Sequence, residues 1–151
     1  MEYYLENLSP SNIQVLFLFF TGYISETEED HAETLTMFKR WQRYVASGTI
    51  TGIETANLLA ILPGSPLEHV AKQDNYLFMN DNNGINLTYW INPKLPNYDF
   101  KIRVKRHIEV IEEAIKYKWP LWNGEASTMR YLESLKQYNK SSKKYVPILS
   151  L

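Results

Sequence analysis

The 151-residue sequence contains no cysteine, which excludes disulfide bonds, thiolate metal sites and cysteine nucleophiles. It also has no long apolar run. The most apolar stretch, Ile13 to Phe20, is far shorter than the roughly 20 residues that a membrane span needs. The first residues include Glu2 and Glu6 instead of a basic segment, so no secretion signal is predicted. These absences together predict a cytoplasmic protein that does not enter a membrane.

The recognisable motifs of catalysis and cofactor binding are also missing. The sequence has no Walker-type glycine loop, no dinucleotide-binding fingerprint, no HExxH and no GxSxG. Glu28 and His31 have the spacing of one half of a di-metal site, but the second copy that such sites need is absent. His107 is followed by several glutamates, which an exposed helix face explains more simply than an acid–base cluster. We therefore predict no cofactor, no metal and no catalytic residue, and the interpretation leans away from an enzyme.

The composition is that of an ordinary globular protein, with 44% hydrophobic and 22% charged residues. No linker divides the chain, so residues 1–151 are predicted to form a single domain. The net charge of −1 conceals an asymmetry. Residues 1–70 carry nine acidic against three basic side chains, and residues 71–151 carry eight acidic against thirteen basic ones. Such a bipolar chain can present two different faces to partners.

The first half of the sequence carries three patterns typical of helix starts. Ser25 and Glu28 form a capping box that opens a long amphipathic helix ending at Gly48. Thr51 with Glu54, and Ser65 with Glu68, repeat the spacing, and they predict helices over 51–62 and from 66 to about 73. For residues 10–20 periodicity does not separate a buried helix from a buried strand, and the Ser9-Pro10 start favours a helix.

The second half begins with signals of β-structure. Two aromatic and β-branched stretches flank Asn83-Gly84, the strongest short hairpin signal, and predict a hairpin over 75–91. Residues 99–104 alternate between apolar and basic side chains and predict a third strand, although Asp99 could instead cap a long helix. Helices are expected over 106–118 and 126–138. The predicted fold is therefore α+β, with five or six helices packed on a small antiparallel β-meander.

Two charged surfaces are candidate binding sites. An acidic face at the start of the long helix, whose candidate contacts are Glu26, Glu29, Asp30 and Glu33, could steer a basic protein partner. A basic set with interleaved tyrosines could follow a single nucleic-acid strand. The candidate contacts in this basic set are Lys101, Arg103, Lys105, Arg106, Lys136 and Lys140. The isoelectric point near 6.3 weakens the nucleic-acid interpretation.

The sequence is rich in aromatic side chains, with eleven tyrosines, four tryptophans and six phenylalanines. Tyr89, Trp90, Trp119 and Trp122 are candidate anchors of a protein interface, because exposed Tyr and Trp often hold most of the binding energy.

The leading functional hypothesis is a protein-binding module, most simply an inhibitor of another protein. In composition the chain resembles the small immunity proteins that neutralise bacterial toxins, or a phage-encoded inhibitor, and no family motif carries this likeness. A nucleic-acid-binding module is the alternative hypothesis, and a small enzyme without a local motif is the third.

Overall fold

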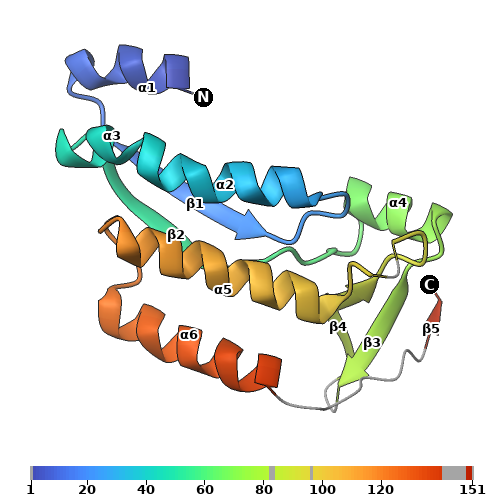
Figure 1. Cartoon of the computed structure of the whole chain (residues 1–151). Coiled ribbons are helices and arrows are strands. Elements are labelled where there is room, and N and C mark those ends of the chain that lie inside the picture. The colour runs from blue at the N-terminus through green and yellow to red at the C-terminus, as the bar shows by residue number, and fades with distance from the viewer. Residues whose placement is uncertain (1, 82–83, 96, 141–148, 151) are drawn as a thin grey trace.

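The computed structural model describes residues 2–81, 84–95, 97–140 and 149–150. These residues form six α-helices, one short 3-10 helix and five strands in two small sheets, which confirms the α+β prediction (Figure 1). The arrangement of the strands differs from the predicted meander. The elements in chain order are α1 (Glu2–Leu8), η1 (Ser9–Ser11), β1 (Val15–Thr21), α2 (Glu28–Arg40), α3 (Gln42–Ala46), β2 (Ile50–Leu58), α4 (Pro66–Gln73), β3 (Leu77–Asp81), β4 (Gly84–Ile91), α5 (Phe100–Lys116), α6 (Glu125–Lys140) and β5 (Leu149–Ser150).

The first sheet is a parallel pair of β1 and β2, joined by the crossover helices α2 and α3. This corrects two predictions, because a helix was favoured for residues 10–20 and expected for residues 51–62. β1 is apolar on every side, so its sequence has no period that distinguishes a strand from a helix. Thr51 and Glu54 match a capping box by spacing, but Thr51 lies within β2 and its hydroxyl donates to the carbonyl oxygen of Val15 at 3.2 Å.

A short segment after α5 extends this parallel pair on the far edge of β2. Ile53 donates its amide to the carbonyl oxygen of Pro120 at 2.8 Å and accepts from the amide of Trp122 at 3.0 Å. The sheet edge at β2 is therefore covered by the chain itself.

The second sheet has the strand order β4–β3–β5. The predicted hairpin is confirmed, since β3 and β4 pair antiparallel from Leu77↔Ile91 to Asp81↔Gly84. Residue 83 of the predicted Asn-Gly turn lies outside the described residues. The third strand is β5, which pairs with β3. The prediction of a strand at 99–104 was wrong, because the Asp99 carboxylate caps a helix there by accepting from the Ile102 amide at 2.9 Å.

The helix predicted from Ser25 to Gly48 is two helices with a different start. Thr27, two residues after Ser25, is the N-cap of α2. Its hydroxyl accepts from the Asp30 amide at 3.1 Å, while the Asp30 carboxylate accepts from the Thr27 amide at 2.9 Å. The helix is interrupted at Trp41, which ends α2 and precedes α3. The prediction for residues 66–73 is confirmed, because the Ser65 side chain accepts from the Glu68 amide at 3.2 Å.

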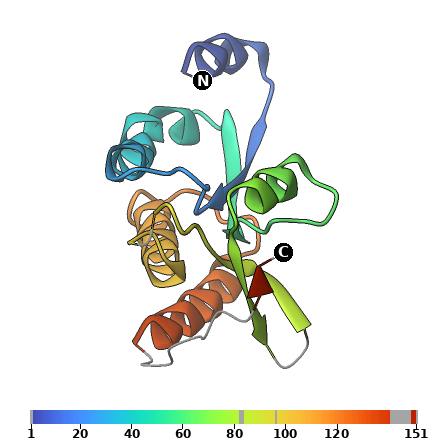
Figure 2. The same ribbon diagram turned by 90° about the vertical axis from the view of Figure 1, so that its right-hand side faces the viewer.

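The helix α5 is the central element, lying between α2 and α6 (Figure 1). It buries Val110 and Ala114 against the parallel sheet, and Val104, Ile108 and Ile111 against α6. α2, α3 and α5 lie on one side of the parallel sheet, and α4 lies on the other side (Figure 2). None of the described helices is both long and apolar enough to cross a membrane.

Candidate functional site: polar clusters on the central helix and an apolar sheet face

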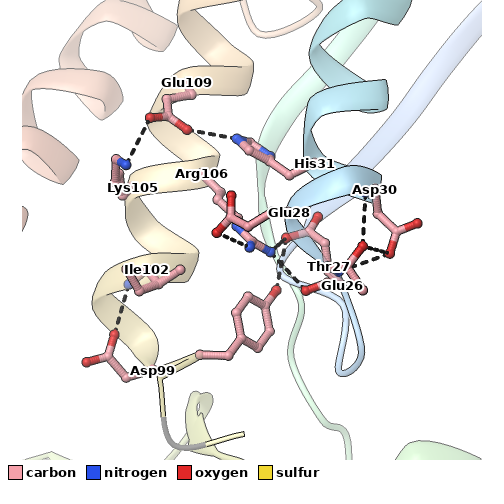
Figure 3. A network of polar contacts seen from close by, with 11 residues as sticks. Glu26, Thr27, Glu28, Asp30, His31, Asp99, Ile102, Lys105, Arg106 and Glu109 are labelled. Carbon is pink, nitrogen blue, oxygen red and sulfur yellow. Dashed lines mark hydrogen bonds and ion pairs between the residues drawn. The ribbon is translucent and has the colours of Figure 1, made fainter.

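A buried guanidinium on α5 organises the start of α2 (Figure 3). Arg106 donates to the main-chain oxygen of Glu26 at 3.0 Å and to its carboxylate at 2.9 Å, and its second terminal nitrogen donates to Glu28 at 2.7 Å. The Tyr98 hydroxyl also donates to the Glu26 carboxylate, at 3.0 Å. Burial and the neighbouring Glu26 charge both raise the pKa of Tyr98. We call these four residues the Arg106 cluster.

A second contact between α2 and α5 joins His31 to Glu109. The imidazole Nε2 lies 2.7 Å from a Glu109 carboxylate oxygen, and Lys105 lies 3.6 Å from the other oxygen. His31 is buried. Glu28 and His31, which have the spacing of one half of a di-metal site, have different partners, since His31 contacts Glu109 on α5 and Glu28 accepts from Arg106. No group of three or more potential metal ligands occurs among the described residues.

Three side chains of the predicted acidic face, Glu26, Glu28 and Asp30, bond to groups within the protein. Glu26 is turned inward and only 12% of its side chain is exposed. Hydrogen bonding to Arg106 lowers the pKa of Glu28, and hydrogen bonding to the Thr27 amide lowers the pKa of Asp30. Four of these acidic side chains are exposed on the surface of α2: Glu28, Glu29, Asp30 and Glu33. Of these, Glu28 and Asp30 are the two already bonded to Arg106 and Thr27. The acidic surface open to a partner is therefore smaller than the sequence indicates.

A cavity of about 450 Å³ opens beside the Arg106 cluster. Its walls combine the apolar side chains of Leu95 and Ile102 with the polar start of α2. The charges around it are already paired, because Arg106 binds its two glutamates and Lys94 forms an ion pair with Asp74. The cavity therefore has the size of a small-molecule site, but among the described residues that line it each charged group already has a partner within the protein.

The four predicted aromatic anchors do not form one surface. Trp90 is fully buried, stacks with Tyr76 at 5.5 Å between ring centroids and donates to the carbonyl oxygen of Leu59. Trp119 is also buried and donates to the carbonyl oxygen of Phe38. Their polar edges find acceptors in the core, which the sequence-based argument for exposure did not foresee.

The other two aromatic anchors are more accessible. Tyr89 is half-buried and stacks on Phe100 with ring centroids 3.9 Å apart. Trp122 is 63% exposed. Of the four side chains, Trp122 alone presents most of its surface to solvent.

The predicted basic set is also divided by the fold. Arg103 and Arg106 are buried and face inward from α5. Arg103 lies 3.7 Å above the Trp90 ring and donates to the Trp90 carbonyl oxygen at 2.8 Å, and burial lowers its pKa to about 10. Lys136 forms an ion pair with Glu112 at 2.8 Å. The two arginines therefore stabilise the fold, and any contacts to nucleic-acid phosphates would have to be made by lysines. The exposed lysines of the predicted set are Lys101, Lys105 and Lys140.

An apolar surface that the sequence did not reveal lies on the parallel sheet. Val15, Phe17 and Phe19 pack into the core. Because side chains alternate along a strand, Leu16, Leu18 and Phe20 point to the opposite face. Leu18 is 72% exposed and Phe20 is 54% exposed.

The same face continues across the sheet. A Cβ placed on Gly52 of β2 would lie 3.1 Å from Leu16 and 3.9 Å from the Trp122 ring, so these side chains flank Gly52. We call Leu16, Leu18, Phe20 and Trp122 the outer face. The signal for the outer face in the sequence was the uncharged run of residues 13–20. The run predicts an exposed apolar face only if it is assigned as a strand, because every second side chain then points to the same face.

No known protein family matches the chain, and no curated protein or solved structure matches it either. Its function has therefore to be argued from its own residues.

Proposed function

We propose that this chain is a protein-binding module whose contact surface is centred on the outer face. The observation that carries the proposal is the exposure of Leu18 and Phe20 on a parallel strand. Parallel sheets are normally covered on both faces. Here α2, α3 and α5 cover one face (Figure 2). On the other side, where α4 lies, Leu18 and Phe20 of β1 stay exposed. A partner that covers the other completes the layered arrangement.

The physical gain from covering this face is substantial. Burying a large apolar side chain that is exposed in the free protein contributes roughly 1.5–3 kcal/mol. Leu18, Phe20 and Trp122 are each more than half exposed, and Trp is among the residues that most often anchor interfaces. Contiguous exposed apolar surface on a folded protein commonly marks an interaction site.

The exposed charges that remain on α2 suit a basic rim on the partner. Glu29 and Glu33 lie on the solvent side of the helix. Rim charges act mainly on the rate of encounter, so these two residues would steer association while the outer face holds the complex together. The proposal includes the sequence-based hypothesis that binding inhibits the partner, and a cytoplasmic location in which the two proteins meet.

The test is capture of a partner from the source cell with matched variants of the purified protein. Phe20→Ser and Trp122→Ser each remove one apolar side chain from the outer face. Leu62→Ser is the control, because Leu62 is a similarly exposed apolar residue, at 56%, outside the outer face. We expect the wild type and the Leu62 variant to capture the same protein, and the two outer-face variants to lose it.

A protein captured equally by all four forms would contradict the proposal, as would capture of nothing at micromolar bait. The inhibition hypothesis needs one further assay. The activity of the captured protein should fall when the wild type is added, and should stay unchanged with Trp122→Ser.

A further inference from the structure

We infer that the free edge of β1 pairs antiparallel with β1 of a second copy of this chain. The edge is distinct from the outer face, because main-chain groups lie in the plane of the sheet and side chains stand perpendicular to it. Self-pairing would therefore occupy the edge and leave the outer face open. The inference goes beyond the proposed function, since it concerns a different surface and a different partner.

One edge of β1 has no strand beside it among the described residues, as its sheet contains only β1 and β2. The Val15 amide donates to Thr49 and the Thr21 carbonyl accepts from Leu59, so both residues direct their main chain toward the β2 side. Because main-chain groups alternate along a strand, those of Leu16, Leu18 and Phe20 point to the free edge. This edge is a ready template for another strand.

The free edge lacks the features that usually protect such strands. Edge strands are commonly blunted by a charge, a proline or a bulge. β1 has neither charge nor proline. The pairing steps from Val15↔Ile50 to Leu16↔Gly52, and from Leu18↔Glu54 to Phe20↔Asn57, so the extra residues lie on β2. β1 itself is a regular strand of seven residues.

A second copy of β1 can meet this edge without repulsion between charges, and it brings the same apolar side chains. No charged residue occurs from Ser9 to Ser25, so an antiparallel copy brings no like charges together. The first charges on either side are Glu6 and Glu26. Glu6 is 3.2 Å from Arg43, and Glu26 is turned inward to Arg106. Both are already paired with arginines of their own chain.

The two-fold symmetry of such a dimer fixes its register. A pair centred on Leu18 places Leu18 opposite Leu18 of the second copy, and Leu16 opposite Phe20 of the second copy. The contact is isologous, as in most homodimers, and closes after two chains. It also joins the outer faces of the two copies into one wider apolar surface. A partner protein would then meet two such faces side by side.

The absence of cysteine makes the register directly testable, since any introduced cysteine is the only one. Directly opposed residues of an antiparallel pair lie about 4.5–5.5 Å apart at Cα. This separation falls within the roughly 4.4–6.8 Å that a disulfide spans. Leu18→Cys should therefore cross-link to itself under mild oxidation. Leu16→Cys alone should not, because its copy lies four residues away along the strand, about 13 Å.

A mixture of Leu16→Cys and Phe20→Cys should form the mixed dimer, because these positions face each other. Leu62→Cys serves as the control for random collision, as Leu62 is a similarly exposed residue that does not belong to β1. The wild type should show, by sedimentation equilibrium, a mass that rises with concentration toward twice 17.8 kDa. Each cysteine replaces an exposed or half-buried side chain outside the core, so the variants should fold.

A wild type that stays monomeric at all concentrations would overturn the inference. So would cross-linking of Leu18→Cys that is no faster than that of Leu62→Cys, or equal cross-linking of Leu16→Cys and Leu18→Cys. These outcomes are separable from failure of the proposed function, which is read from partner capture by Trp122→Ser at the opposite edge of the sheet.

Discussion

Arg106 on α5 holds Glu26 by two hydrogen bonds, one to the main-chain oxygen and one to the carboxylate. The two residues are 80 positions apart in the sequence, and only 6% and 12% of their side chains are exposed. This contact fixes the loop between β1 and α2 against the central helix. It thereby decides which acidic side chains remain available at the surface.

Removal of Glu26 should destabilise the fold more than removal of Glu28. Glu26→Ala leaves the buried Arg106 guanidinium and the Tyr98 hydroxyl without their shared acceptor, and breaking a buried ion pair costs about 3 kcal/mol. Glu28→Ala removes an exposed carboxylate from the same guanidinium, and its effect should be clearly smaller. Urea unfolding of both variants measures the difference. Equal losses would show that Glu26 is not the main partner of Arg106.

Burial of His107 should make the protein sensitive to mild acid. Burial lowers the pKa of this imidazole from 6.5 to about 4. As the pH falls through this window, the unfolded chain binds a proton that the folded protein does not, so stability declines. Each pH unit there is worth about 1.4 kcal/mol, for a total of about 3 kcal/mol.

His107→Gln should remove this component of the pH dependence. The carboxylates make the same contribution to the pH dependence of the wild type and of the His107→Gln variant. The difference between their two profiles of unfolding free energy against pH is therefore the contribution of the imidazole. The Thr21 hydroxyl, 2.7 Å from the imidazole Nδ1, can also bond the glutamine amide. Parallel profiles between pH 4 and 6.5 would contradict this account.

Gly22 should tolerate substitution less well than Gly48. Both have a positive φ, 81° and 78°, where a side chain costs about 1 kcal/mol. A Cβ on Gly22 would also lie 3.1 Å from Cδ of Arg103, whereas one on Gly48 would meet nothing within 4 Å. Arg103 is buried and held by Trp90, so it has little room to move. Thermal unfolding of the two alanine variants should therefore show the larger loss for Gly22→Ala.

The parts of the fold that the sequence predicted are those set by local chemistry. The helix after Ser65 has its cap and its proline in adjacent residues, and the Glu68 carboxylate accepts from the Gly64 amide just before the cap. The two strands of the β3–β4 hairpin are close neighbours in the sequence. α6 has apolar side chains at helical spacing and buries Leu132 and Leu135. In these elements the conformation that the local sequence favours is also the one that tertiary packing favours. The sequence alone therefore predicts them correctly.

The missed elements depend on partners far along the chain. β2 carries a capping-box spacing at Thr51, but pairing with β1 and with Leu121 overrides it. The alternation at 99–104 reads as a strand because Arg103 was counted as an exposed side chain. Its acceptor is the carbonyl of Trp90, on a different element. The outer face was missed for the same reason, since it exists only once β1 is known to be a strand.

The start of α2 allows a direct test of which residue caps the helix, because the sequence and the structure favour different residues. Both Ser25 and Thr27 precede the helix, and the spacing to Glu28 favoured Ser25 as the cap. In the structure Thr27 accepts from the Asp30 amide and Asp30 accepts from the Thr27 amide and hydroxyl. Thr27→Ala should therefore lower the free energy of unfolding by about 1 kcal/mol, the usual cost of losing an N-cap. Ser25→Ala should have little effect, because Ser25 lies before the N-cap position. Chemical denaturation of the two variants gives the comparison, and a larger loss for Ser25→Ala would move the helix start back to the position that the sequence favoured.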